Sequence, residues 1–316
     1  MHLLYGGILL RHQLINLLKV GWTVLRIIAV ISSSIVTILS SLLPLFLYTS
    51  ISNSYLFFMF LLLSFAAIMI HGGLTHLFND YADYLSGTDE LSPAILSGGS
   101  RVIQKKLLKP ESVYKIGKWI SISLIIIAVI MAIFNRLELT ILILVGVWAA
   151  YSYSLPPLRL SYRPFVGEWL SLFPAIFFLG LAGPWIILET IPLWAYQNAT
   201  INALVCMGWV MVHHIPDIKA DQNAKPMKKT SIVWFVNKFG MKTANIPALM
   251  YYTMALIYSF WLLSDRLLAG IIVILLLFIA LIFIRKMKVN EINQVTHVEK
   301  TLLLLAVFIA IVLGIF

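Results

Sequence analysis

Apolar runs separated by shorter polar segments make up most of this chain. Many of the runs are too long for the core of a soluble domain and approach the roughly 20 residues that cross a bilayer as a helix. We expect about nine spanning helices, near residues 27–48, 55–77, 119–134, 138–154, 168–188, 199–214, 245–263, 267–284 and 301–315. The pattern predicts an all-α fold, a polytopic membrane helix bundle.

Composition supports the same class, because 61% of the residues are hydrophobic, 11% are charged and the mean hydropathy is +0.95. We expect a single integral-membrane domain over residues 1–316. Residues 3–10 are apolar, but no small-residue cleavage site follows them. We therefore interpret residues 1–21 as an interfacial helix rather than a removed signal peptide.

The basic residues indicate how the chain lies in the membrane. All but two of the 23 Lys and Arg residues lie around the start of the first predicted helix or in the loops after even-numbered helices; the exceptions are Arg136 and Arg266. Because basic loops remain in the cytoplasm, the N-terminus is predicted to be cytoplasmic and the C-terminus to lie across the membrane. The net charge of +10 also suits anionic headgroups or an anionic substrate. Nucleic acid is not an expected partner, because no soluble basic domain is present to bind it.

Two acidic motifs follow apolar runs on the predicted cytoplasmic side. The first, NDYADYLSGTD at residues 79–89, places Asn79, Asp80 and Asp83 roughly on one face if it is helical. Asp217 and Asp221 share a face in the same way. Carboxylates at the end of a membrane helix are costly unless they are paired, and side-chain oxygens are ligands of divalent cations. These five residues are therefore candidate Mg²⁺ ligands.

The polar loop after the first motif contains Gly98, Gly99 and Ser100, followed by Arg101. Glycines let backbone amides approach an anion closely, and an Arg can bind phosphate oxygens in a bidentate manner. Without an acidic cluster nearby, the same residues would be interpreted as a flexible turn. Lys105 is in the same loop, where a lysine by itself is typical of a topology determinant.

Tyrosine and histidine residues near the motifs have alternative interpretations. Tyr151 and Tyr153 end the fourth predicted helix, where tyrosines commonly form an interfacial belt, although either could lie beside a phosphate pocket or a developing cation. His213 and His214 are adjacent and point about 100° apart on a helix, so they cannot both face one metal. We interpret them as packing or polar lining, and zinc is not expected because no Cys or further His completes a ligand set.

The motifs resemble a known family. NDYADYLSGTD followed by GGSRVIQ, and DIKADQNAKPMKKTS after the sixth predicted helix, are similar to the two signatures of the UbiA-type membrane prenyltransferases. Gly87 stands where many members have a third Asp, and Asp89 follows it. Together with Arg101 and Gln104, this spacing resembles the branch that prenylates 1,4-dihydroxy-2-naphthoate in menaquinone biosynthesis. Gly-Gly-Ser-Arg stands where that branch commonly has Gly-Pro.

The resemblance implies Mg²⁺-dependent transfer of a prenyl group from an isoprenyl diphosphate to an aromatic acceptor, with Mn²⁺ as a substitute ion. It implies an enzyme of the lipid bilayer, in the inner (plasma) membrane of a bacterium, with its active site facing the cytoplasm. Implied catalytic residues are Asp80, Asp83, Asp217 and Asp221. Implied substrate-binding residues are Asn79, Asp89, Arg101, Lys105, Tyr151, Tyr153, Arg159 and Lys228.

Three alternatives stay open at this point. One is another acceptor, such as 4-hydroxybenzoate or a glycerol-phosphate lipid. Another is a membrane terpene cyclase, in which the substrate's own double bonds capture the cation. A divalent-cation transporter is the more distant alternative, because transport needs polar residues along a path through the midplane, whereas these acids gather at one membrane face. The prenyl chain length and the oligomeric state are not predicted.

Overall fold

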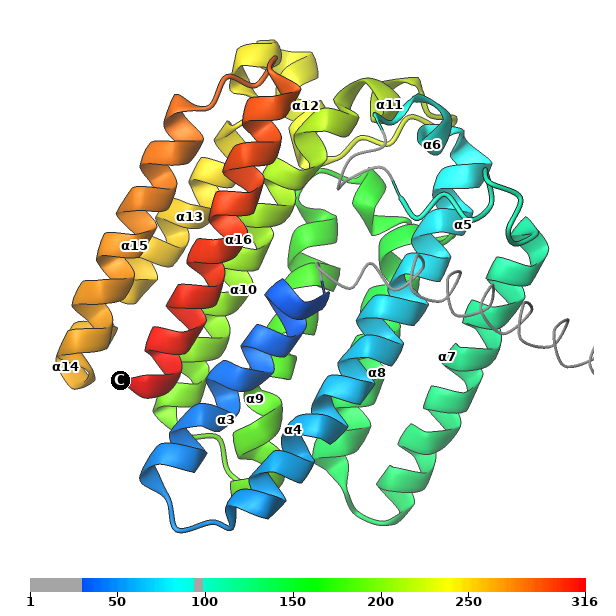
Figure 1. Ribbon diagram of the computed structural model, residues 1–316. Coiled ribbons are helices and arrows are strands. Elements are labelled where there is room, and N and C mark those ends of the chain that lie inside the picture. The colour runs from blue at the N-terminus through cyan, green and yellow to red at the C-terminus, as the bar shows by residue number, and fades with distance from the viewer. Residues whose placement is uncertain (1–29, 94–98) are drawn as a thin grey trace, which may run out of the picture.

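A computed structural model of the protein describes residues 30–93 and 99–316. Within these ranges every regular element is helical, and nine helical segments are long and apolar enough to cross a membrane. They are Ile31–Tyr48, Asn53–Ser86, Pro110–Ile133, Leu137–Ser154, Glu168–Leu188, Leu193–Asn223, Met241–Asp265, Leu267–Lys286 and Ile292–Ile315. The predicted all-α bundle with nine spans is confirmed (Figure 1). The interfacial helix predicted for residues 1–21 lies outside the described residues.

The spans are built from the following α-helices: α3 (Val36–Tyr48), α4 (Asn53–Ala67), α5 (His76–Ser86), α7 (Pro110–Ile133), α8 (Leu137–Ser154), α9 (Phe173–Leu188), α10 (Leu193–His214), α11 (Ile218–Asn223), α13 (Ile246–Ser259), α14 (Leu262–Asp265), α15 (Leu267–Lys286) and α16 (Ile292–Ile315). Two more helices, α6 (Thr88–Leu91) and α12 (Ser231–Phe239), lie between spans. A π-helical stretch, Ile68–Thr75, joins α4 to α5 without a break in the helix, and a 3-10 turn, Ile215–Asp217, joins α10 to α11.

Both motif-bearing spans are longer than predicted. The second continues through the first acidic motif to Ser86 and ends at Gly87, whose φ of +75° provides a left-handed helix cap. The sixth continues to Asn223. The third and ninth start earlier than predicted, at Pro110 and Ile292. Hydropathy marks the apolar part of a helix, whereas backbone hydrogen bonding continues through polar turns that extend beyond it.

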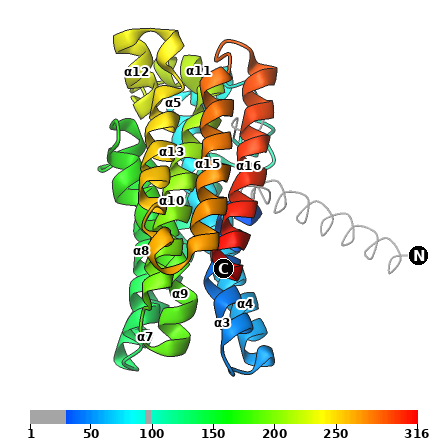
Figure 2. The same cartoon turned by 90° about the vertical axis from the view of Figure 1, so that its left-hand side faces the viewer.

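Helix α10 lies inside the bundle and contacts α9, α13, α16 and α3. Close approach to α13 depends on Gly208, since a Cβ there would lie 2.5 Å from a ring carbon of Tyr252. Helices α4, α5, α7 and α8 form the other side of the molecule, and the two views show both groups running roughly along one direction (Figures 1 and 2). The two groups of helices therefore face each other across the middle of the bundle.

The two acidic motifs meet at one end of the bundle, where α5, α6, α11 and α12 gather, and the C-terminus lies toward the other end (Figure 1). The backbone amide of Lys225 donates a hydrogen bond of 2.9 Å to the carbonyl oxygen of Ser86. The segment that follows the second motif is thus bonded to the helix that carries the first.

Candidate active site

A cavity of about 510 Å³ runs from this end into the bundle. Its polar wall comprises Asn79, Asp83, Thr88, Asp89, Ser92, Asp217, Asp221 and Lys228. Its apolar wall includes Leu62, Ile70, Met131, Leu139, Ile143 and Phe178. Met131 is near the end of α7 and Leu139 near the start of α8, on the side away from the motifs. The cavity therefore suits a ligand with a polar head and a long apolar tail.

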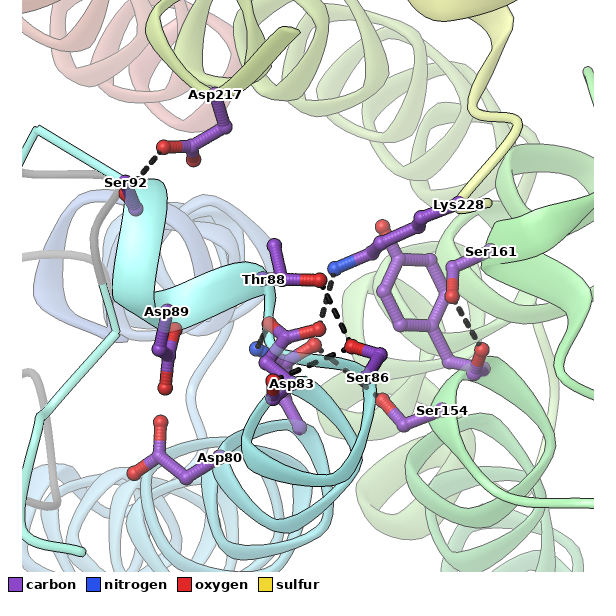
Figure 3. A network of polar contacts seen from close by, with 12 residues as sticks. Asp80, Asp83, Ser86, Thr88, Asp89, Ser92, Ser154, Ser161, Asp217 and Lys228 are labelled. Atoms are coloured by element: carbon purple, nitrogen blue, oxygen red, sulfur yellow. Dashed lines mark hydrogen bonds and ion pairs between the residues drawn. The ribbon is translucent and has the colours of Figure 1, made fainter. Parts of the chain in front are cut away.

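Asp83 and Lys228 join the two motifs in a buried ion pair. Lys228 Nζ lies 2.8 Å from Asp83 Oδ1, and both residues are at most 5% exposed. The Asn79 carboxamide donates a 2.8 Å hydrogen bond to the other Asp83 oxygen. Burial opposes the charge on Lys228, but the carboxylates of Asp83 and Asp221 outweigh it and hold the pKa of this lysine well above its ordinary value. A permanent cation therefore lies on the polar wall (Figure 3).

The glycine-containing loop closes on carboxylates of the first motif. The Ser100 backbone amide donates to Asp80 Oδ1 at 3.2 Å, and the Ser100 hydroxyl donates to the second Asp80 oxygen. Gly99 has a φ of +65°, and a Cβ there would lie 2.9 Å from Asp89 Oδ1. The expected close approach of this backbone to an anion is thus made to the protein's own carboxylates. Gly98 lies outside the described residues.

Asp89 is a buried member of the acidic cluster. It begins the short helix α6, lines the cavity and accepts a 2.9 Å hydrogen bond from the Gln104 carboxamide. Burial first, and then the charges of Asp83 and Asp80, raise the pKa of Asp89 to about 8. In Figure 3, the Asp89 and Asp80 carboxylates face each other. Such a cluster gains stability from a bound cation.

The second motif contributes two different carboxylates. Asp217 is half-buried and accepts a hydrogen bond from the Ser92 hydroxyl. Asp221 is 1% exposed, and neither of its carboxylate oxygens has a hydrogen-bond partner among the described residues. Burying a carboxylate without a partner is costly, so a group in this condition beside a cavity indicates that a ligand completes it.

The cavity wall fits a divalent cation in its chemistry. Four carboxylates line it, those of Asp83, Asp89, Asp217 and Asp221, against the single ammonium of Lys228. Such oxygen donors are the hard ligands that Mg²⁺ prefers. Across residues 30–93 and 99–316, however, no three acidic, His or Cys side chains are already close enough to hold an ion. Mg²⁺ usually needs only one or two protein carboxylates, because substrate phosphates and waters complete its ligand set.

The other predicted binding residues divide between the cavity and its surroundings. Tyr153 lines the cavity, whereas Tyr151 is 37% exposed and donates to the Pro156 carbonyl oxygen at 3.0 Å. This partly exposed position agrees with the interpretation of Tyr151 as an interfacial tyrosine. Asp80, which the loop covers, does not line the cavity either.

Of the basic residues predicted to bind substrate, only Lys228 lines the cavity. The Arg101 guanidinium donates to the Ser92 carbonyl oxygen and so fixes the loop. Arg159 lies over the Tyr162 ring, 5.6 Å from its centroid, and Lys105 is exposed. In this structure, the side chains of Arg101, Lys105 and Arg159 therefore do not line the cavity.

Sequence reasoning missed Thr88, Ser92 and Glu299, whereas it interpreted His213 as packing or polar lining. Thr88 and Ser92 line the cavity beside the predicted acids. His213 also lines it, and its Nδ1 lies 2.6 Å from Oε1 of Glu299, a fully buried carboxylate on α16. The sequence signal for Glu299 is its place three residues before Leu302, on the apolar face of α16, but the ninth helix was predicted to begin only after it.

These features define a class of protein: an integral-membrane helix bundle with a carboxylate-rich cavity that continues between apolar helices. The family model described as the UbiA prenyltransferase family matches residues 34–312, and the chain belongs to this family. The predicted family is confirmed, and with it an enzyme of the prenyltransferase class. Comparison with curated proteins and with solved structures gave no match.

Proposed function

We propose that this protein transfers a prenyl group from an isoprenyl diphosphate to 1,4-dihydroxy-2-naphthoate, the prenylation of menaquinone biosynthesis. One observation carries the proposal: a cavity of about 510 Å³ has carboxylates and a buried lysine at one end, and the rest of its wall is mostly apolar with a few polar side chains, such as those of Ser34, His71 and Ser171. A diphosphate head and an isoprenoid tail have the same division.

The polar end would bind the diphosphate through Lys228 and the hydroxyl and amide donors beside it. Lys228 already carries a charge, and the Thr88 hydroxyl and the Asn79 carboxamide line the same wall. Four carboxylates on that wall would repel an anion unless divalent cations were present. Asn79 and Asp83 on one side, and Asp217 and Asp221 on the other, are the proposed ligands, whereas Asp80, which is bonded to Ser100 behind the cavity wall, would add negative charge beside them. Bound there, Mg²⁺ would stabilise the charge that develops on the leaving diphosphate.

The apolar part of the cavity would hold the tail and keep water from the reacting carbon. As the C–O bond breaks, its electron pair leaves with the diphosphate and an allylic cation forms. The ring of Tyr153 lines the cavity and offers a π face to that cation. An electron-rich carbon of the acceptor then bonds to the allylic carbon, and the ring carboxylate leaves as CO₂.

The choice of acceptor rests on the pattern of the first motif. The spacing of Asp83, Gly87 and Asp89 and the pair Arg101 and Gln104 resemble the naphthoate branch. In the structure Gly87 caps α5, and Gln104 donates to Asp89. These contacts give the branch-like residues a shared task, the placement of Asp89 on the cavity wall.

Purified protein supplied with farnesyl or geranylgeranyl diphosphate and equal amounts of 1,4-dihydroxy-2-naphthoate and 4-hydroxybenzoate tests this proposal. The expected product is the prenylated naphthalenediol, or the quinone that air forms from it, in a reaction that excess EDTA abolishes. Prenylation of 4-hydroxybenzoate alone would make the acceptor assignment wrong. A cyclic hydrocarbon or alcohol formed without either acceptor would indicate a terpene cyclase.

A further inference from the structure

A histidine and a glutamate from different spans form a buried pair on the cavity wall. His213 lies in the last turn of α10, and its Nδ1 lies 2.6 Å from Oε1 of Glu299 on α16. The glutamate side chain is 0% exposed and the histidine side chain 13% exposed. The other carboxylate oxygen of Glu299 has no hydrogen-bond partner among the described residues. A carboxylate buried in a membrane span and directed at one imidazole is costly to maintain and points to a functional role.

The pair lies one helical turn from the second acidic motif. Trp209, His213 and Asp217 follow one another at intervals of four residues, and all three line the cavity. His213 precedes Asp217 by about one helical turn, with the 3-10 turn Ile215–Asp217 between them, and so lies deeper in the bundle. In the proposed reaction, a diphosphate held at the level of the motif would place its first prenyl carbon, and hence the attacking ring of the acceptor, deeper in the cavity toward His213.

Glu299 determines how the imidazole presents itself to the cavity. An ionised carboxylate only accepts hydrogen bonds, so Nδ1 carries the proton in this contact and Nε2 carries the lone pair. The indole of Trp209 stacks on the imidazole with ring centroids 5.0 Å apart, which restrains the plane of the ring.

We propose that His213 is the catalytic base that accepts the proton of the acceptor's ring hydroxyl. Glu299 is the positioning residue that orients the imidazole of His213. This inference rests on the proposed transfer to a hydroxylated aromatic acceptor. Removing the hydroxyl proton raises electron density on the ring carbons, and a base of this kind contributes about 10²- to 10⁴-fold to a rate.

The protons and electrons balance over one turnover. The acceptor O–H bond breaks and its proton bonds to Nε2, while the oxygen electron pair moves into the ring. The ring carbon that carries the carboxylate bonds to the allylic carbon as the C–O bond to the diphosphate breaks and its electron pair leaves with that group. When CO₂ departs from that same carbon, its bonding pair restores aromaticity, and the imidazolium returns the proton to oxygen. His213 ends the cycle neutral.

The test compares wild type with His213→Gln and Glu299→Gln, using a series of acceptors with increasingly acidic hydroxyl groups. With the parent acceptor, we expect kcat to fall by about 10²-fold or more in H213Q and by less in E299Q, where an amide oxygen can still accept from Nδ1. Because an acceptor that is already ionised needs no base, both defects should shrink as acceptor acidity rises. A histidine that only joins α10 to α16 would give no such dependence.

His297→Gln is the matched control, since His297 is exposed on the same helix as Glu299 and should keep wild-type kinetics. Binding of an unreactive thio analogue of the prenyl diphosphate should be unchanged in H213Q. Should H213Q fail to fold, E299Q carries the acidity test alone. Wild-type kcat in a folded variant, or a defect that is equal for all acceptors, would overturn the role of this pair. A wild-type protein that prenylates no hydroxylated acceptor would instead overturn the proposed function.

Discussion

Each end of the bundle contains a buried polar cluster, and the two clusters differ in how completely they are satisfied. At the end away from the motifs, the Arg266 guanidinium donates to Asn198 Oδ1 at 2.7 Å, to the Phe316 carbonyl oxygen at 3.0 Å and to the Leu313 carbonyl oxygen. The Asn198 carboxamide in turn donates to the Ser40 and Leu313 carbonyl oxygens. This cluster connects α3, α10 and α16 within the protein.

At the motif end, carboxylates exceed cations. Asp83 is paired with Lys228, but neither oxygen of Asp221 has a hydrogen-bond partner within residues 30–93 and 99–316, and burial with neighbouring charge raises the pKa of Asp89 to about 8. A satisfied buried cluster stabilises the fold, whereas an incompletely satisfied one is stabilised by what binds to it. The difference separates a structural polar cluster from a candidate site even though both are buried.

The largest expected effect comes from Asp221→Asn, which keeps the size of the side chain and removes its charge. If the unpartnered carboxylate serves the ligand, the variant should lose about 10²- to 10³-fold in kcat/KM for prenyl transfer. Its melting temperature should stay the same or rise, because a buried charge has been removed. Asp265→Asn, at an exposed position on α14, is the control for both measurements. A D221N protein with wild-type rates, or one that is strongly destabilised, would place Asp221 among structural residues.

The Asp83 and Lys228 pair is both a structural link and part of the proposed site, so breaking it should cost stability as well. Asp83→Asn or Lys228→Met alone leaves a buried charge without its partner, which costs about 3–5 kcal/mol. The double variant should lose less free energy of unfolding than the two single variants together. Denaturation of the ligand-free protein measures all three losses. For comparison, the same set of two single variants and one double variant at the exposed pair Lys288 and Glu291 should change the free energy of unfolding by no more than about 1 kcal/mol. Additive losses at Asp83 and Lys228 would mean that their contact contributes nothing.

Arg266→Met tests the satisfied cluster at the opposite end. The substitution leaves the buried Asn198 carboxamide oxygen without its donor and removes one of the two donors to the Leu313 carbonyl oxygen, at a cost of about 1–3 kcal/mol in the free energy of unfolding. Turnover per folded molecule should not change, because nothing in this cluster borders the cavity. Arg136→Met, at a half-exposed side chain on the same end, is the control and should have a smaller effect. A loss of turnover without a loss of stability would show that the two ends are coupled.

How much of this could be predicted differs between the fold and the site. Run length and hydropathy predicted the number and order of the spans, because a bilayer imposes both. They did not predict that α5 continues through the first motif or that α16 begins before Glu299, because local hydrogen bonding extends helices past their apolar residues. Because the ninth span was predicted to start too late, the buried carboxylate of Glu299 was assigned to a loop.

For the site, residue type identified the acids but not their partners. Asp83 and Lys228 are 145 residues apart, and their contact depends on how α5 and the segment after α11 meet. Arg101, Lys105 and Arg159, which were also predicted to bind substrate, do not line the cavity. Membrane topology enriches all basic residues on one side, so the sequence does not reveal which of them is buried. Burial singles out Lys228.

The smallest predicted effect concerns the loop that covers the acidic end. Gly99 has a φ of +65°, and a Cβ there would lie 2.9 Å from Asp89 Oδ1, whereas Gly240 has a φ of +89° and open space around the same atom. Gly99→Ala and Gly240→Ala should therefore both carry a backbone cost of about 1–3 kcal/mol, because alanine rarely adopts a positive φ. Only G99A should also displace the Asp89 carboxylate. We expect the Mg²⁺ concentration that gives half-maximal activity to rise several-fold in G99A and to stay at the wild-type value in G240A. Equal Mg²⁺ dependence in the two variants would mean that the contact between this loop and Asp89 is incidental to cation binding, and that the unsatisfied part of the cluster is confined to the second motif.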